Sequence, residues 1–216
     1  MEGKRRLGRT GVALRAVLIA ALVFALSGCV EIFQYITQNQ DGEIEVSASV
    51  RVQKSLFEIA TGFTGEPPPD YESEFGFTED EILREYPEQL EMGFRSIDTE
   101  LEYGFEVTLS GTPELLQQHR GAPFIPHTER EVTSILFEGE GNGSADDDLA
   151  LALFASSKYR LLISKNYLPN ISEVWYETRG DRAPVELHDY EDVYLVEFPI
   201  VYLFASDADG SLKIAH

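Results

Sequence analysis

The feature that most constrains this chain is a basic and then uncharged segment near its beginning. Five basic residues lie between positions 4 and 15, and the eleven residues 16–26 carry no charge. A basic region, a short apolar run and small residues before a cleavage site are typical of a secretory signal peptide. Eleven residues at about 1.5 Å each are too few to span a bilayer as a helix. We therefore predict that residues 1–28 are a signal peptide that is removed.

The four residues that close this segment carry a more specific pattern. Leu26, Ser27, Gly28 and Cys29 resemble the lipobox of bacterial lipoproteins. The resemblance implies that the Cys29 thiol is diacylated and that the chain is then cut in front of it, leaving a lipid-anchored N-terminus. The alternative is an ordinary secretory signal with a chance cysteine. Cys29 is the only cysteine in the chain, so no intrachain disulfide competes for it.

The residues that follow Cys29 bear on location. Val30 and Glu31 stand where many lipoproteins held in an inner membrane have an Asp, and the resemblance to that sorting rule implies an outer membrane or cell surface. No Ser/Gly-rich tether follows either, so the mature domain has almost no reach from its membrane. We predict a lipid-anchored protein of the cell envelope.

Charge excludes one class of partner. Residues 1–28 hold five of the 17 basic and one of the 38 acidic residues, which leaves the mature part with a formal charge of −25. Phosphate binding needs a basic surface, so we expect no nucleic-acid partner. The same charge disfavours electrostatic docking on anionic headgroups. The acids are spread along the chain, which favours a hydrated surface over a dedicated face for cations or basic partners.

Alternation of apolar and polar residues predicts strands from the start of the mature part. Residues 31–38 and 43–53 flank an Asp-Gly pair, which predicts a hairpin with a two-residue turn that places Tyr35 opposite Ala48. Residues 95–110 alternate without a break and predict one long strand.

The remaining patterns decide the predicted fold class. Further strands are predicted at residues 131–138, 159–164, 171–178, 185–188, 193–204 and 211–215, and helices at 54–62, 78–86, 112–118 and 144–157. We predict one acidic α+β domain over residues 29–216. Its mainly antiparallel sheet of six to nine strands would be covered on one face by three or four short helices.

No catalytic, metal-binding or cofactor motif is recognisable, so we predict a protein that is not an enzyme, with no catalytic residues, no metal and no cofactor. The histidines lie too far apart for a local zinc pattern. Two alternatives stay open. An envelope hydrolase would use acidic residues or a histidine such as His119 or His127. A cation-binding surface protein would bring residues 146–148 close to residues 189–192.

Large aromatic side chains recur on the predicted strands. Core filling explains them, and an aromatic-lined cavity for a lipid or other apolar ligand is the alternative. We predict that such a cavity would be lined by Tyr103, Phe105, Trp175 and Tyr202.

A second resemblance concerns about the first third of the chain. The hairpin directly after Cys29, the predicted helix at Lys54, Ser55, Leu56 and Phe57, and the later strands are similar to LppM-type envelope lipoproteins. That resemblance implies an α+β ligand-binding or interaction domain. The predicted function is thus non-catalytic binding, with the membrane, an apolar ligand or another envelope protein as the partner.

Overall fold

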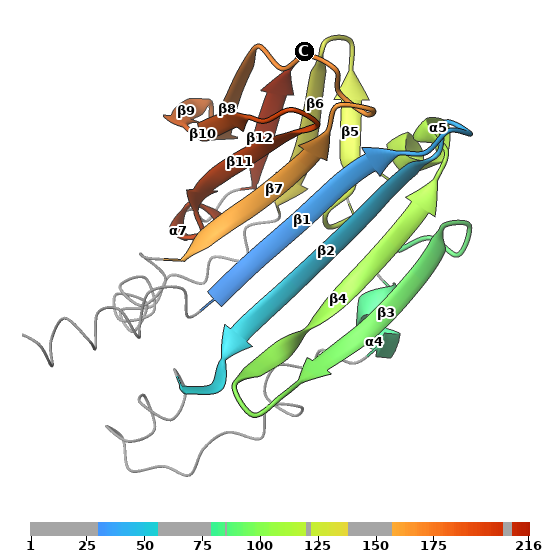
Figure 1. The fold of residues 1–216 in the computed structure, drawn as a ribbon, viewed down its shortest axis with the longest axis vertical. Helices are drawn as coiled ribbons and strands as arrows, with labels where there is room; N and C mark the ends of the chain where they lie inside the picture. The colour runs from blue at the N-terminus through green and yellow to red at the C-terminus, as the bar shows by residue number, and fades with distance from the viewer. Residues whose placement is uncertain (1–29, 56–78, 85, 120–121, 138–156, 205–208) are drawn as a thin grey trace, which may run out of the picture.

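The computed structural model describes residues 30–55, 79–84, 86–119, 122–137, 157–204 and 209–216. Strands dominate these residues and form two sheets (Figure 1). The predicted signal peptide, the lipidation site, most of the predicted helix at 54–62 and nearly all of that at 144–157 lie outside the described residues.

The larger sheet has seven strands in the order β10-β11-β7-β1-β2-β4-β3. The strands are β1 (Val30–Gln38), β2 (Ile44–Gln53), β3 (Glu91–Asp98), β4 (Glu102–Gly111), β7 (Lys158–Ser164), β10 (Glu186–Asp189) and β11 (Val193–Pro199). All neighbours are antiparallel except β1 and β7, which are parallel. β1 is therefore a central strand, hydrogen-bonded on both edges.

The smaller sheet has five antiparallel strands in the order β5-β6-β12-β8-β9. They are β5 (Pro126–Glu129), β6 (Val132–Phe137), β8 (Glu173–Thr178), β9 (Asp181–Pro184) and β12 (Gly210–Ala215). Its inner face packs on the β1, β7 and β11 half of the larger sheet. Phe137 contacts Tyr159, and Tyr176 contacts Phe198, with ring centroids 5.4 and 5.5 Å apart.

The fold prediction is wrong in what covers the sheet. The described helices are only α4 (Glu79–Arg84), α5 (Pro113–Gln118) and α7 (Val201–Phe204), and six residues make a helix of about 9 Å. Such short helices cannot cover a seven-stranded face. The second sheet covers one half of it, which makes the protein mostly β rather than α+β.

Two hairpins also differ from the prediction. Five residues, 39–43, connect β1 and β2, with Gly42 at φ 87°, and Tyr35 pairs with Ser47 instead of Ala48. Because side chains alternate with a period of two, this shift of one residue moves Tyr35 away from the buried row of Ile36 and Val46.

The predicted long strand at 95–110 is the β3–β4 hairpin. Thr99 forms its turn, because its hydroxyl accepts hydrogen bonds from the amides of Leu101 and Glu102. Asp98 therefore pairs with Tyr103 across the hairpin. The turn holds no glycine or proline, so the alternation runs through it and hides it from pattern analysis.

Candidate functional site

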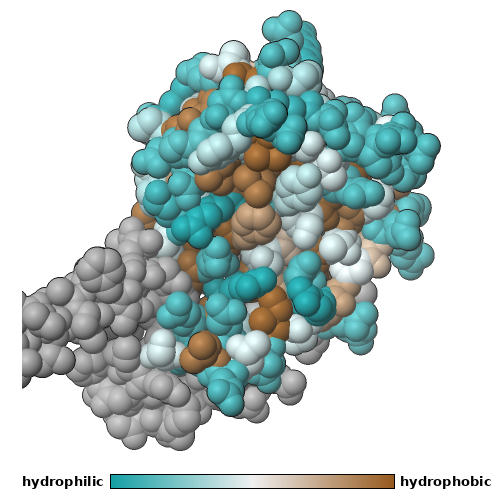
Figure 2. Space-filling view, in the orientation of Figure 1, coloured by the Kyte–Doolittle hydropathy of each residue, from teal (hydrophilic) through white to brown (hydrophobic). Residues whose placement is uncertain are grey.

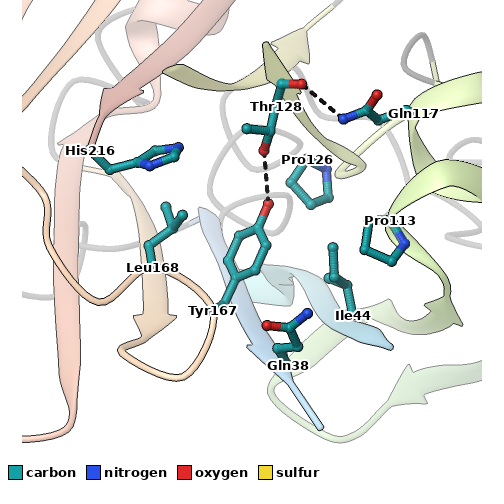
Figure 3. A pocket seen from close by; sticks show the side chains of 9 residues that line it. All are labelled: Gln38, Ile44, Pro113, Gln117, Pro126, Thr128, Tyr167, Leu168 and His216. Carbon is teal, nitrogen blue, oxygen red and sulfur yellow. Dashed lines mark hydrogen bonds between the residues drawn. The ribbon is translucent and has the colours of Figure 1, made fainter. Parts of the chain in front are cut away.

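A pocket of about 290 Å³ lies where both sheets and α5 meet (Figure 3). It is lined by Gln38, Ile44, Pro113, Gln117, Pro126, Thr128, Tyr167, Leu168 and His216. These residues come from the end of β1, the start of β2, α5, β5, the turn after β7 and the residue after β12. The pocket is therefore at the end of the larger sheet where β1 finishes.

Local sequence explains how the pocket is held. Thr112 caps α5, since its hydroxyl accepts a hydrogen bond from the Leu115 amide and Pro113 follows at the first helical position. The turn after β7 is fixed by Ser164, whose carbonyl accepts from the amides of Tyr167 and Leu168. Both segments thus present their pocket side chains on short, hydrogen-bonded supports.

A chain of hydrogen bonds runs along one wall. Gln117 Nε2 donates to the Thr128 carbonyl at 2.9 Å, and the Thr128 hydroxyl lies 3.4 Å from the Tyr167 hydroxyl and 2.9 Å from that of Thr133. Thr133 in turn lies 3.1 Å from His216 Nε2. Burial raises the pKa of the Tyr167 hydroxyl, while its hydrogen bonds with Thr128 and Thr133 oppose the shift. Tyr167 is therefore a neutral hydroxyl at neutral pH.

The lining of this pocket is mostly apolar or neutral. Acid–base catalysis usually joins an imidazole or carboxyl to a second group that orients it or shares its proton. Among the described residues the pocket has one imidazole, His216, and no carboxylate. It combines apolar surface from Ile44, Leu168 and two prolines with neutral hydrogen-bonding groups.

A second cluster lies on the outer face of the larger sheet. The ligand atoms of Glu186, His188 and Glu197 lie within 4.8 Å of one another. Lys158 Nζ, however, is 3.5 Å from a carboxylate oxygen of each glutamate. The Lys158 ammonium group thus already forms ion pairs with both acids.

Arg160 extends this cluster into a surface network. Its guanidinium donates to Glu197 and Glu31, both at 2.9 Å. Burial would raise the pKa of Glu197, but the hydrogen bond from Arg160 and the charges of Lys158 and Arg160 lower it overall. These groups form a network of ion pairs across β1, β7, β11 and β10. This ion pairing is enough to explain why the charged groups lie together.

The four residues predicted to line an apolar cavity lie in separate places. Tyr103 and Phe105 are buried on β4, where Phe105 stacks on Phe94 at 6.2 Å. Trp175 lies on β8, beneath the Arg182 guanidinium at 4.3 Å, on the opposite face of its strand from Tyr176. None of the four lines the described pocket.

Tyr202 belongs to an aromatic cluster between the sheets. Its ring stacks on Phe198 at 6.2 Å and contacts the Tyr176 ring in a tilted arrangement at 5.8 Å, measured between ring centroids. Phe198 also stacks on Tyr159 at 4.8 Å and is only 1% exposed. Rings fill the space between the sheets here, as expected of a packed core. That the four predicted residues bind a ligand stays a prediction.

The histidines and acids of the two alternatives are not brought together in the described parts. His119 caps the end of α5, and His127 lies on β5 with both ring nitrogens buried and unpartnered. Residues 146–148 lie outside the described residues. Asp189, from the other acidic group, pairs with Lys165 at 2.7 Å.

Cys29 lies outside the described residues, but the structure describes Val30, the residue that follows it. Val30 is the first residue of β1, and its amide donates to the Ser157 hydroxyl at 3.3 Å. The predicted lipidation site is therefore one peptide bond from a buried central strand. No helix in the described parts is long and apolar enough to cross a membrane.

Sequence reasoning missed the pocket residues because they come from six distant segments. No local spacing connects Gln38 with Tyr167 or His216, and β5, which supplies two of the lining residues, was not among the predicted strands. Thr112 and Pro113 were the only local signal, and they indicated a helix start rather than a site.

Comparisons with known proteins add little. No family model matches the chain. A beta-glucosidase A from Butyrivibrio fibrisolvens is 33% identical over 93 residues, which span 40% of this chain and only 10% of that protein. The folded domain of LppM from Mycobacterium tuberculosis superposes with a TM-score of 0.38 at 7% identity, covering 88% of this chain and 91% of that domain. A TM-score below 0.5 establishes no shared fold, so the proposals below rest on this chain's own residues.

Proposed function

We propose that this chain is a lipid-anchored domain of the cell envelope that binds a ligand or partner without catalysing a reaction. The observation that carries the proposal is the position of Val30, which begins the central strand β1 directly after the lipobox cysteine. A lipid on Cys29 would hold the start of β1 at the bilayer, since one residue spans only about 3.5 Å.

The pocket is then presented away from the membrane. β1 has nine residues at about 3.3 Å each, so Gln38 lies roughly 30 Å from the anchored end. A ligand would reach the pocket from the aqueous side. The mixture of apolar walls with neutral hydrogen-bonding groups suits a small, uncharged molecule with one apolar face.

The proposal also concerns which membrane holds the protein. Val30 and Glu31 after the lipobox favour an outer membrane or cell surface over an inner membrane, by resemblance to the sorting rule. The mature charge of −25 makes electrostatic attraction to anionic lipids unfavourable, so the lipid itself would supply the anchoring energy.

Cys29→Ser tests the anchor. In its own host, the unaltered chain should sediment with membranes and resist extraction by high salt, whereas Cys29→Ser should be released. Ser47→Ala, a change on the outer face of β2, is the matched control and should stay with the membrane. Unchanged sedimentation of Cys29→Ser would refute the lipid anchor.

Native mass spectrometry of the protein purified from its host tests the pocket. The proposal expects a small, uncharged molecule to co-purify and to be lost in Gln117→Leu, with Tyr202→Phe as a control outside the pocket. An acyl chain that co-purifies and is insensitive to Gln117→Leu would instead support the apolar ligand predicted from the sequence.

A further inference from the structure

We propose that the tip of the β3–β4 hairpin, through Leu101, is a second contact with the bilayer that fixes the orientation of the anchored domain. The inference rests on the proposed lipidation of Cys29 and concerns a different residue. Leu101 is 75% exposed, and it and Tyr190 are the large apolar side chains that stand out as exposed among the described residues.

Strand register places Leu101 near the level of Val30, the residue that follows Cys29 in the sequence. Val30 pairs with Val52, and Val52 pairs with Tyr103, so these three residues form one row across β1, β2 and β4. Leu101 lies two residues beyond this row. At about 3.3 Å per residue and about 4.8 Å between strands, Leu101 projects about 7 Å beyond the row and lies about 10 Å to the side of Val30.

The hairpin tip is held in this position. The Lys54 amide donates to the Leu101 carbonyl at 2.8 Å, which ties the tip to the end of β2. Thr99 accepts from the amides of Leu101 and Glu102, which closes the turn. Figure 1 shows the tip, the start of β1 and α7 at the same end of the larger sheet. A lipid on Cys29 would thus bring Leu101 to the headgroup layer.

Charge at the tip is largely paired. Lys54 Nζ lies 2.5 Å from Asp98, and Arg51 lies 3.8 Å from Glu102. Glu100 is the remaining acid, and it sits at the interface, where a carboxylate can stay in water. Pairing of the two flanking acids removes much of the repulsion that the acidic protein would otherwise have for an anionic surface.

Among the residues that the structure describes, Tyr190 is the other large apolar side chain that is strongly exposed. On the face of the molecule shown in Figure 2, hydrophilic residues separate the apolar patches. Tyr190, the other exposed apolar side chain, lies in the β10–β11 turn, beside Asp189 and Glu191. Val193 after that turn pairs with Ser164 at the end of β7, so Tyr190 is at the opposite end of the sheet.

Tryptophan quenching in vesicles tests this inference on the full lipidated chain. Trp175→Phe removes the only native tryptophan, and Leu101→Trp or Tyr190→Trp is then added. The chains are reconstituted through their lipid into phosphatidylcholine vesicles with brominated acyl chains. We expect Leu101→Trp to lose most of its emission and to shift to the blue, and Tyr190→Trp to keep the emission it has with unbrominated lipid.

Each other outcome overturns the inference in a distinct way. If neither tryptophan is quenched although the chain floats with the vesicles, the anchor stands and the Leu101 contact is wrong. If both are quenched, both ends of the larger sheet reach the bilayer and the proposed orientation is wrong. If the chain does not float, the lipid anchor fails and the inference fails with it. Matching urea midpoints for the two variants would exclude unfolding as the cause.

Discussion

The two ends of the larger sheet differ in what they present to their surroundings. The end that holds Val30 has a tight hairpin with one exposed leucine and paired charges. The end that holds Gln38 gathers α5, β5 and the turn after β7 around a pocket (Figure 1 and Figure 3). The difference indicates that the two ends have different roles. One end would contact the membrane and the other would bind a ligand.

One core connects these ends. Buried side chains of both sheets form a single cluster, in which Leu161 and Val196 of the larger sheet join Ile135 and Leu212 of the smaller one. Changes in the shared core and changes near one end should therefore have different effects. Changes in the shared core should affect the stability of the whole domain, whereas changes near one end should act mainly there.

The largest expected effect comes from Phe198→Ala. Phe198 is 1% exposed and contacts rings from both sheets, so its removal leaves a cavity that should lower the free energy of unfolding by about 3–5 kcal/mol. Urea denaturation measures this, and Tyr202→Phe, which keeps the ring at the edge of the cluster, is the control. A loss below about 1 kcal/mol would show that the sheets do not share a core.

Gln34→Leu should have the next largest effect. Gln34 is fully buried, accepts a hydrogen bond from the Tyr159 hydroxyl and donates to the Phe124 carbonyl at 2.7 Å. Leucine leaves both partners unsatisfied, at a cost of about 1–3 kcal/mol in urea denaturation. The double change Gln34→Leu with Tyr159→Phe should cost less than the sum of the two single changes. Strict additivity would contradict the pairing.

High pH should weaken the same core. Burial raises the pKa of the Tyr159 hydroxyl above its ordinary value of 10.0. The stability that depends on neutral Tyr159 is therefore complete below pH 10 and is lost as the pH rises, because the unfolded chain ionises this phenol first. Tyr159→Phe should show a smaller loss of stability between pH 9 and 11, and equal losses would count against a buried neutral phenol.

Thr112→Ala should have the smallest effect and should act at the pocket end. Removal of the α5 cap should cost about 1 kcal/mol in urea denaturation. Hydrogen exchange should rise in α5 and at Thr128, which Gln117 contacts, and should stay unchanged at the β3–β4 hairpin. An equal increase in hydrogen exchange at both ends of the larger sheet would contradict the expected difference between the two ends.

Local patterns predicted much of the fold. β6, β7, β8, β10, β12 and the capped helix α5 lie close to their predicted positions, because alternation and capping are local signals. The hairpin at Thr99 was missed because its turn uses a threonine hydroxyl instead of glycine. The second sheet was missed because pairing between β6, β12 and β8 depends on residues 32–83 positions apart.

The candidate sites divide in the same way. Cys29 is a local motif, so the sequence alone could nominate it. The pocket depends on long-range contacts such as that of Thr128 with Tyr167, and only the structure brings these residues together. Aromatic composition favoured core filling, as Phe198 and Tyr159 illustrate, and that Tyr103, Phe105, Trp175 and Tyr202 line a ligand cavity stays a prediction.

The most direct test of the account is the mass of the mature N-terminal peptide, taken from the protein extracted with detergent from its host membranes. The account predicts that this peptide begins at Cys29 and carries the added mass of a diacylglyceryl group on the thiol, with Val30 and Glu31 following unmodified. A mature chain that begins elsewhere, or that begins at an unmodified Cys29, would contradict the claim that the start of β1 is held at the membrane.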